Sequence, residues 1–180
     1  MQRRRARVCA AVAFVLASAT ARGETIELAP GPAEVGFRAY GLGLLPIDGR
    51  FTRFHGALAF HRPDHADCTV TLTVDLQSLV MDQASVRDDV LGPDEMDAAQ
   101  FPRLTYAGRC QAEKIAGELT LRGVTHPFAL SIAWTPDQAK ASGHLRRAEW
   151  GMTGKPLLAG STVRIDVAVS LAPPGRQAAR

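Results

Sequence analysis

The sequence predicts an all-β protein: an eight-stranded antiparallel barrel with a short helical insertion between its third and fourth strands. Apolar and polar residues alternate with a period of two along most of the 180 residues, as in strands that bury one face and expose the other. Eight such segments follow one another, and eight strands can close into an up-and-down barrel.

Residues 1–21 come before the alternating segments and have the pattern of a secretory leader. Four arginines within Arg3–Arg7 precede the apolar run Val8–Leu16, which is too short to span a bilayer. Ala17-Ser18-Ala19 or Ala19-Thr20-Ala21 supplies the small residues that a signal peptidase needs. We therefore expect a signal peptide at 1–21, a periplasmic or secreted location, and no membrane span in the mature protein.

The basic character of the chain belongs to this leader. The chain has 21 basic and 18 acidic residues, and loss of the four leader arginines leaves 17 basic residues. A nucleic-acid binder needs a basic stripe on the folded domain. We therefore expect no nucleic-acid partner.

The first three strands are expected at about 34–40, 47–60 and 70–76. In the second, the alternation shifts by one residue at Thr52-Arg53, which is typical of a β-bulge. In the third, valine and leucine alternate with threonine and aspartate. Each of these strands therefore has one face suited to a core.

The period changes between Ser78 and Pro102, where the insertion is expected. Val86 and Val90 are four residues apart, which predicts a short helix within 82–91. A second helical turn is expected at 94–99, and it ends before Pro102 because the residue preceding a proline disfavours the α region.

Five further strands follow, at about 104–111, 115–121, 128–134, 141–150 and 163–171. The proline-rich segment 173–180 is expected to be a flexible tail, so the barrel domain covers 22–172. Gly49, Gly56 and Gly117 lie on the inward faces of their strands, and glycine there leaves room beside larger neighbours. We therefore expect a partly open, apolar lumen.

Two cysteines, Cys68 and Cys110, remain once Cys9 leaves with the leader. The strands that flank the insertion are expected to be antiparallel neighbours, and pairing Leu72 with Tyr106 brings 68 opposite 110. An exported protein favours disulfides. We therefore predict a Cys68–Cys110 disulfide.

Several ordered motifs resemble the YceI-like family of exported lipid-binding proteins, over about residues 24–171. They are Ile47-x-Gly49-x-Phe51-x-x-Phe54-x-Gly56-x-Leu58-x-Phe60, Phe101-Pro102-x-Leu104-Thr105-Tyr106 and Gly117-x-Leu119-Thr120-Leu121-x-Gly123-Val124-Thr125-His126-Pro127. The resemblance implies a lipocalin-like barrel that holds a long-chain isoprenoid or similar lipid in an apolar tunnel, for carriage or sequestration.

Twelve residues are candidates for the tunnel wall: Phe37, Leu42, Gly49, Phe51, Phe54, Val86, Val90, Phe101, Gly117, Leu119, Phe128 and Trp134. The same aromatic side chains could instead fill the core. The alternative function is therefore a structural or interaction barrel with a self-filled core and no lipid. The sequence leaves a homodimer open.

Nothing in the sequence indicates catalysis, a cofactor or a metal. His61 and His65 are four apart, but Pro63 between them indicates an exposed turn rather than two ligands on a helix. Arg87 and Asp88 could orient a lipid head group or pin the helix, and the structural role is favoured. We expect a binding protein, not an enzyme.

Overall fold

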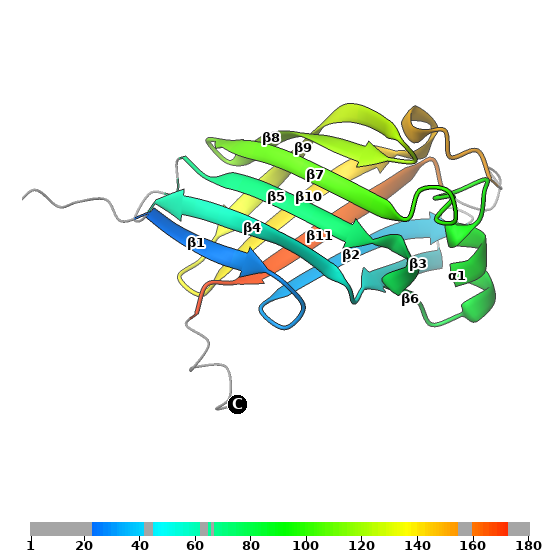
Figure 1. Ribbon diagram of the computed structural model, residues 1–180, viewed down its shortest axis with the longest axis horizontal. Coiled ribbons are helices and arrows are strands. Elements are labelled where there is room, and N and C mark those ends of the chain that lie inside the picture. Colours follow the sequence, from blue (N-terminus) through cyan, green and yellow to red (C-terminus); the bar gives the residue numbers. More distant parts are fainter. Residues whose placement is uncertain (1–22, 42–44, 62–64, 66, 155–159, 173–180) are drawn as a thin grey trace, which may run out of the picture.

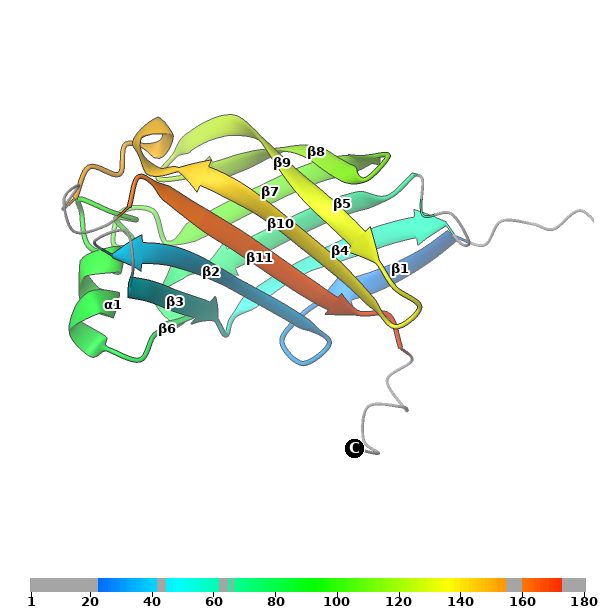
Figure 2. The same cartoon turned by 180° about the vertical axis from the view of Figure 1, so that it is seen from behind.

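The computed structural model describes residues 23–41, 45–61, 65, 67–154 and 160–172. Over these residues, eleven strands form one antiparallel sheet in the order β1-β4-β5-β7-β8-β9-β10-β11-β2-β3-β6. The sheet curls into an elongated barrel, and an α-helix covers one of its ends (Figures 1 and 2). The predicted leader (1–21), the predicted tail (173–180) and Leu42 lie outside the described residues.

The strands are β1 Gly23–Leu28, β2 Ala33–Gly41, β3 Leu45–Phe51, β4 Phe54–His61, β5 Thr69–Asp75, β6 Leu79–Val80, β7 Arg103–Gln111, β8 Lys114–Leu121, β9 Val124–Trp134, β10 Gln138–Arg146 and β11 Thr162–Ser170. The helix α1 is Ala84–Leu91, and the 3₁₀ turns η1 and η2 are Leu76–Ser78 and Arg147–Trp150. The helix thus lies between β6 and β7.

The prediction of eight strands is wrong by three. Strand β1 was missed because it adjoins the leader and only Leu28 in it is fully buried. Strand β6 has two residues, too few to show a period. The predicted strand at 47–60 is two strands, β3 and β4, because its halves pair with different neighbours.

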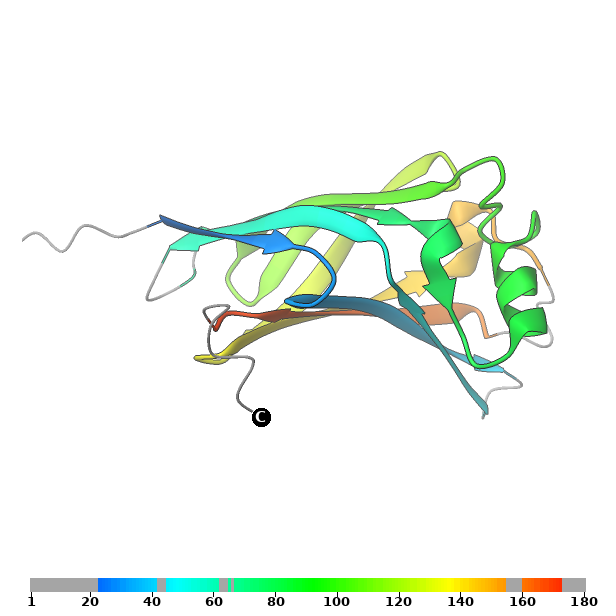
Figure 3. The ribbon, with the colours of Figure 1, turned by 60° about the horizontal axis from the view of Figure 1, so that its bottom comes forward.

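At Thr52-Arg53 the chain passes from β3, near one edge of the sheet, to β4, near the opposite edge (Figure 3). A second crossing, from β5 through η1 to β6, runs beside it. The Thr52 amide donates to the Ser78 carbonyl at 3.2 Å, and the Asp75 amide donates to the Arg53 carbonyl at 3.0 Å. These two crossings connect the opposite edges of the curled sheet. The expected bulge is therefore one of the connections that close the barrel.

The core follows the alternation that the sequence shows. In β2, Val35 and Phe37 are buried whereas Glu34 and Arg38 point outward, the latter in an ion pair with Asp48. Each fully buried aliphatic or phenyl side chain contributes about 1.5–3 kcal/mol relative to exposure. The same pattern on the other long strands gives one continuous apolar interior.

Three local predictions need correction. The segment 94–99 forms hydrogen-bonded turns rather than a helical turn, with the Asp97 amide donating to the Gly92 carbonyl at 2.8 Å. Strand β10 ends at Arg146, and η2 follows it. Strand β9 begins at Val124 rather than at about 128, because Arg122 and Gly123, with φ of 54° and 73°, form the hairpin directly before it.

Candidate functional site

The barrel encloses a cavity of about 450 Å³ at the end that α1 covers. Its wall consists of inward apolar side chains of the strands, together with a methionine that follows η2. They are Phe37, Ala39, Ile47, Phe51, Leu104, Leu121, Leu145, Met152, Val163 and Ile165. This volume and this apolar wall are typical of a site for a small hydrophobic molecule.

Helix α1 and the segment after it form the cover of the cavity, with Val86 and Val90 facing the space. Arg87 fixes the helix to the barrel: its Nε donates to the Leu79 carbonyl at 2.7 Å, and its Nη2 donates to the Gln77 carbonyl at 3.0 Å. The Asp88 carboxylate is 3.4 Å from Arg87 and three-quarters exposed. Arg87 therefore pins the helix, the role that the sequence favoured.

An ion pair between Arg147 and Glu95 lies at the rim of the cavity. The side chains are only 7% and 16% exposed, and the Arg147 Nε donates to the Glu95 Oε2 at 3.1 Å. The guanidinium also donates to the carbonyls of Gly154, at 2.6 Å, and Gly160, at 3.2 Å. The pair therefore ties the cover to two segments of the barrel rim.

A second arginine holds the same cover segment. Arg122, in the β8–β9 hairpin, donates from Nη1 to the carbonyls of Pro93 and Glu95. Burial raises the pKa of Glu95 above its ordinary value, and attraction to Arg147 and Arg122 offsets part of that rise. The charged form of Glu95 is thus stabilised by the two arginines rather than by water.

Glu95 and Arg147 are not among the site residues predicted from the sequence. They are 52 positions apart and belong to no motif. Arg147 lies within the segment predicted as a strand at 141–150, and Glu95 lies in a run of turns. Only the closure of the barrel brings them together.

The expectation that Gly49, Gly56 and Gly117 leave open space is wrong. A Cβ at Gly56 would lie 2.0 Å from the backbone carbonyl oxygen of Thr71. A Cβ at Gly49 would lie 2.4 Å from the Phe37 ring, and a Cβ at Gly117 would lie 2.6 Å from the Tyr106 hydroxyl. At Gly49 and Gly117 the missing side chain leaves a recess that receives an aromatic ring. Interiors pack to crystal-like density, so a neighbouring ring fills each recess.

A second, much smaller cavity of about 30 Å³ lies deeper in the barrel, beyond the first. Tyr106 lines it and is buried, and its hydroxyl is 3.2 Å from each of two acceptors, the carbonyls of Ile115 and Phe128. Burial raises the pKa of Tyr106 to about 12. This half of the barrel is filled mainly by its own side chains.

An aromatic cluster distinct from both cavities contains Trp134. The His65 ring stacks on Trp134 with centroids 4.2 Å apart, and Phe60 is 5.3 Å from Trp134. His65 has a φ of 56°, and its amide donates to the His61 carbonyl at 2.9 Å. His65 is therefore half-buried against Trp134 rather than exposed as predicted.

Four of the twelve candidate wall residues line the larger cavity: Phe37, Phe51, Val86 and Val90. Seven do not: Gly49, Phe54, Phe101, Gly117, Leu119, Phe128 and Trp134. Phe101 lies against Gly123 instead, and the Leu119 carbonyl accepts a hydrogen bond from the Trp150 indole. Alternation indicates which side chains face inward, but it does not show which inward side chains adjoin empty space.

The two cysteines are joined in a disulfide, with Cα atoms 4.8 Å apart. Strands β5 and β7 are antiparallel neighbours in the predicted register, with Leu72 opposite Tyr106. The Cys110 amide also donates to the Cys68 carbonyl at 2.7 Å. The bond ties the start of β5 to the end of β7.

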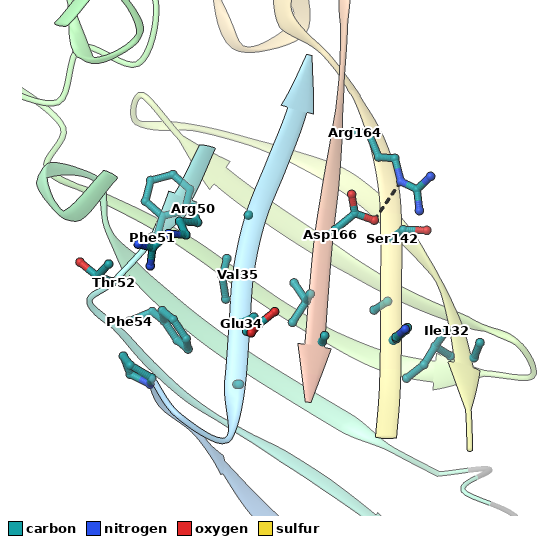
Figure 4. A pocket seen from close by; sticks show the side chains of 18 of the residues that line it. Glu34, Val35, Arg50, Phe51, Thr52, Phe54, Ile132, Ser142, Arg164 and Asp166 are labelled. Carbon is teal, nitrogen blue, oxygen red and sulfur yellow. Dashed lines mark hydrogen bonds and ion pairs between the residues drawn. The ribbon is translucent and has the colours of Figure 1, made fainter. Parts of the chain in front are cut away.

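An open hollow of about 860 Å³, lined by both apolar and polar residues, lies on the outer face of β9, β10, β11, β2 and β3 (Figure 4). Its charged side chains have both signs, and Arg164 pairs with Asp166 at 2.8 Å. Within the described part of the chain, no three His, Cys, Asp or Glu side chains gather in a way that could hold a metal ion. No described helix is long and apolar enough to cross a bilayer.

A curled antiparallel sheet with an apolar cavity under a helical cover defines a lipocalin-like barrel. The chain belongs to the YceI-like family, whose domain model matches residues 27–171. A UPF0312 protein of Enterobacter sp. (strain 638) is 28% identical over 174 residues, covering 88% of this chain and 89% of that protein. A UPF0312 protein of Vibrio campbellii is 30% identical over 118 residues, and the match spans 62% of each chain.

Solved structures share the fold at low sequence identity. Burkholderia cenocepacia BcnA has a TM-score of 0.65 and 19% identity, over 78% of this chain and 96% of its own. A polyisoprenoid binding domain from Saccharophagus degradans, implicated in plant cell wall breakdown, has a TM-score of 0.57 and 13% identity, over 82% and 98%.

Proposed function

We propose that this protein holds the apolar chain of an amphiphilic lipid, first of all an isoprenoid, in the cavity under α1. The observation that carries the proposal is the cavity of about 450 Å³, whose wall is apolar and whose charged residues lie at the rim and cover. Burial of a hydrocarbon chain yields roughly 0.8 kcal/mol per methylene without any partner of fixed geometry. The Saccharophagus degradans domain, which shares the fold, is described as polyisoprenoid-binding, and this supports the choice of lipid.

Binding without catalysis is part of the proposal. The carboxylate of Glu95, the most buried acid at the cavity rim, is committed to Arg147. A general acid or base needs to reach a reacting group, and Glu95 is instead held in the cover. The protein would thus carry or sequester its lipid unchanged.

We also propose that the protein is exported. The leader pattern at 1–21 and the Cys68–Cys110 disulfide both support this. Expression of the full chain in a Gram-negative host, followed by fractionation and mass measurement, tests it. A periplasmic product that begins after Ala19 or Ala21 is expected, and an uncleaved cytoplasmic product would contradict export.

The lipid proposal is tested by native mass spectrometry of protein purified without detergent, then delipidated and titrated with farnesol and geranylgeraniol. The test variant is Ala39→Leu, which adds bulk inside the cavity, and the matched control is Ala168→Leu on the outer hollow. We expect binding by the wild type and the control, and strongly reduced binding by Ala39→Leu. Equal binding by all three would place the lipid elsewhere.

The second candidate function is a structural or interaction barrel without a lipid. The deeper half of the interior favours it, because side chains there leave only about 30 Å³. Folded, delipidated wild-type protein that binds neither alcohol, and from which no lipid co-purifies, would support this alternative.

A further inference from the structure

The interior is divided between two cavities of very different size, and strand register shows where the division falls. One row of inward side chains crosses β3, β2, β11 and β10 at the same level. The row is Phe51, Val35, Val167 and Ala141. Phe51 lines the larger cavity, whereas Val167 and Ala141 line the smaller one. This row is therefore the boundary.

The rows on either side belong to one cavity each. Nearer α1, Phe37 is opposite Gly49 and Ile165, and both Phe37 and Ile165 line the larger cavity. Farther from α1, Val169 is opposite Ala139, and both line the smaller cavity. No other row along these strands has a side chain in each cavity.

Phe51 is the largest side chain in the boundary row, whose other members are two valines and an alanine. It is 7% exposed, and its ring centroid is 6.2 Å from that of Phe37. The glycine opposite Phe37 gives that ring a recess in the wall. Phe51 has valine opposite it on β2 and leucine on β6, so its ring has no equivalent recess.

We propose that Phe51 sets the length of the chain that the protein holds. This inference rests on the proposed function. A chain that fits the larger cavity binds with Phe51 in place. A longer chain has to displace the Phe51 ring in order to join the two cavities, and it loses the packing of that ring against Phe37. Affinity therefore rises with chain length only until the larger cavity is full.

The test is a chain-length series on one head group: geraniol, farnesol, geranylgeraniol and solanesol, titrated into delipidated protein and followed by native mass spectrometry. Three variants are compared with wild type. Phe51→Leu and Phe51→Ala shorten the boundary side chain, and Phe51→Leu does so with the smaller loss of volume if Phe51→Ala fails to fold. The matched control is Phe54→Leu, because Phe54 has the same 7% exposure and lines neither interior cavity.

For the wild type, we expect affinity to rise along the series, stop rising before solanesol, and then fall. Either Phe51 variant should bind solanesol on the order of tenfold more tightly than wild type, whereas Phe54→Leu keeps the wild-type profile. Binding with the same length profile in wild type and both Phe51 variants would overturn the role of Phe51 alone. So would an equal shift in Phe54→Leu. Absence of binding to every alcohol in every protein would instead overturn the proposed function.

Discussion

The ring of Phe37 occupies the space that a side chain at Gly49 would need, since a Cβ there would lie 2.4 Å from the ring. The nearest atoms are all ends of side chains, those of Phe37 and Leu79. Gly49→Ala should therefore push the Phe37 ring into the cavity. We expect lipid binding to weaken at least about tenfold, with a stability loss near 1 kcal/mol, the low end for overpacking.

Gly117→Ala is the contrasting variant. A Cβ at Gly117 would lie 2.4 Å from the backbone carbonyl oxygen of Ala107, and backbone cannot rotate away. This variant should lower the free energy of unfolding by about 1–3 kcal/mol or more. Lipid titration and thermal unfolding of both delipidated variants separate the effects, and equal stability losses would contradict the recess at Gly49.

The ion pair at the rim should matter more to stability than ion pairs on the surface. Glu95→Gln leaves the Arg147 charge buried without its counter-ion, which should cost about 3–5 kcal/mol. Asp166→Asn is the control, because the Arg164–Asp166 pair is about half exposed and should contribute less than about 1 kcal/mol. Urea unfolding measures both, and a loss below 1 kcal/mol for Glu95→Gln would show that the rim is well solvated.

Tyr106 should make the protein sensitive to alkali. Its pKa is about 12 in the folded protein against an ordinary 10.0, so folding favours the neutral phenol. Its contribution is complete below pH 10 and is lost as pH rises through 12, with a maximum of about 2–3 kcal/mol. The Tyr106→Phe variant should lack this loss when unfolding is measured from pH 9 to 12, and identical pH profiles would count against burial as the cause.

The disulfide should contribute substantially to stability. Cys68 and Cys110 are 42 residues apart, and closing such a loop in the unfolded chain contributes about 4 kcal/mol in the chain-entropy model. The double variant Cys68→Ser, Cys110→Ser should be less stable by about that amount. Thiol titration of unfolded, non-reduced exported protein should find no free thiol, and two free thiols would refute the bond.

Much of the fold could be predicted from periodicity alone. Thr162–Ser170 and Thr69–Asp75 alternate along most of their length, and both are strands because each side of such a segment faces a different environment. The register of β5 against β7 followed from one assumption, that strands flanking an insertion pair. The split at Thr52-Arg53 could not be predicted, because a bulge and a crossing between sheet ends produce the same one-residue shift in alternation.

The sequence by itself determined the class of the protein, because the strand period, the leader pattern and the family motifs are all local in the chain. Only the tertiary structure decided where the empty space lies. Gly49 and Gly117 look alike in sequence, yet one adjoins a side chain that can move and the other a backbone carbonyl. Glu95 and Arg147 meet only when the barrel closes. Cavities and ion pairs depend on contacts between distant segments, and one segment's residue pattern does not encode its neighbour across the barrel.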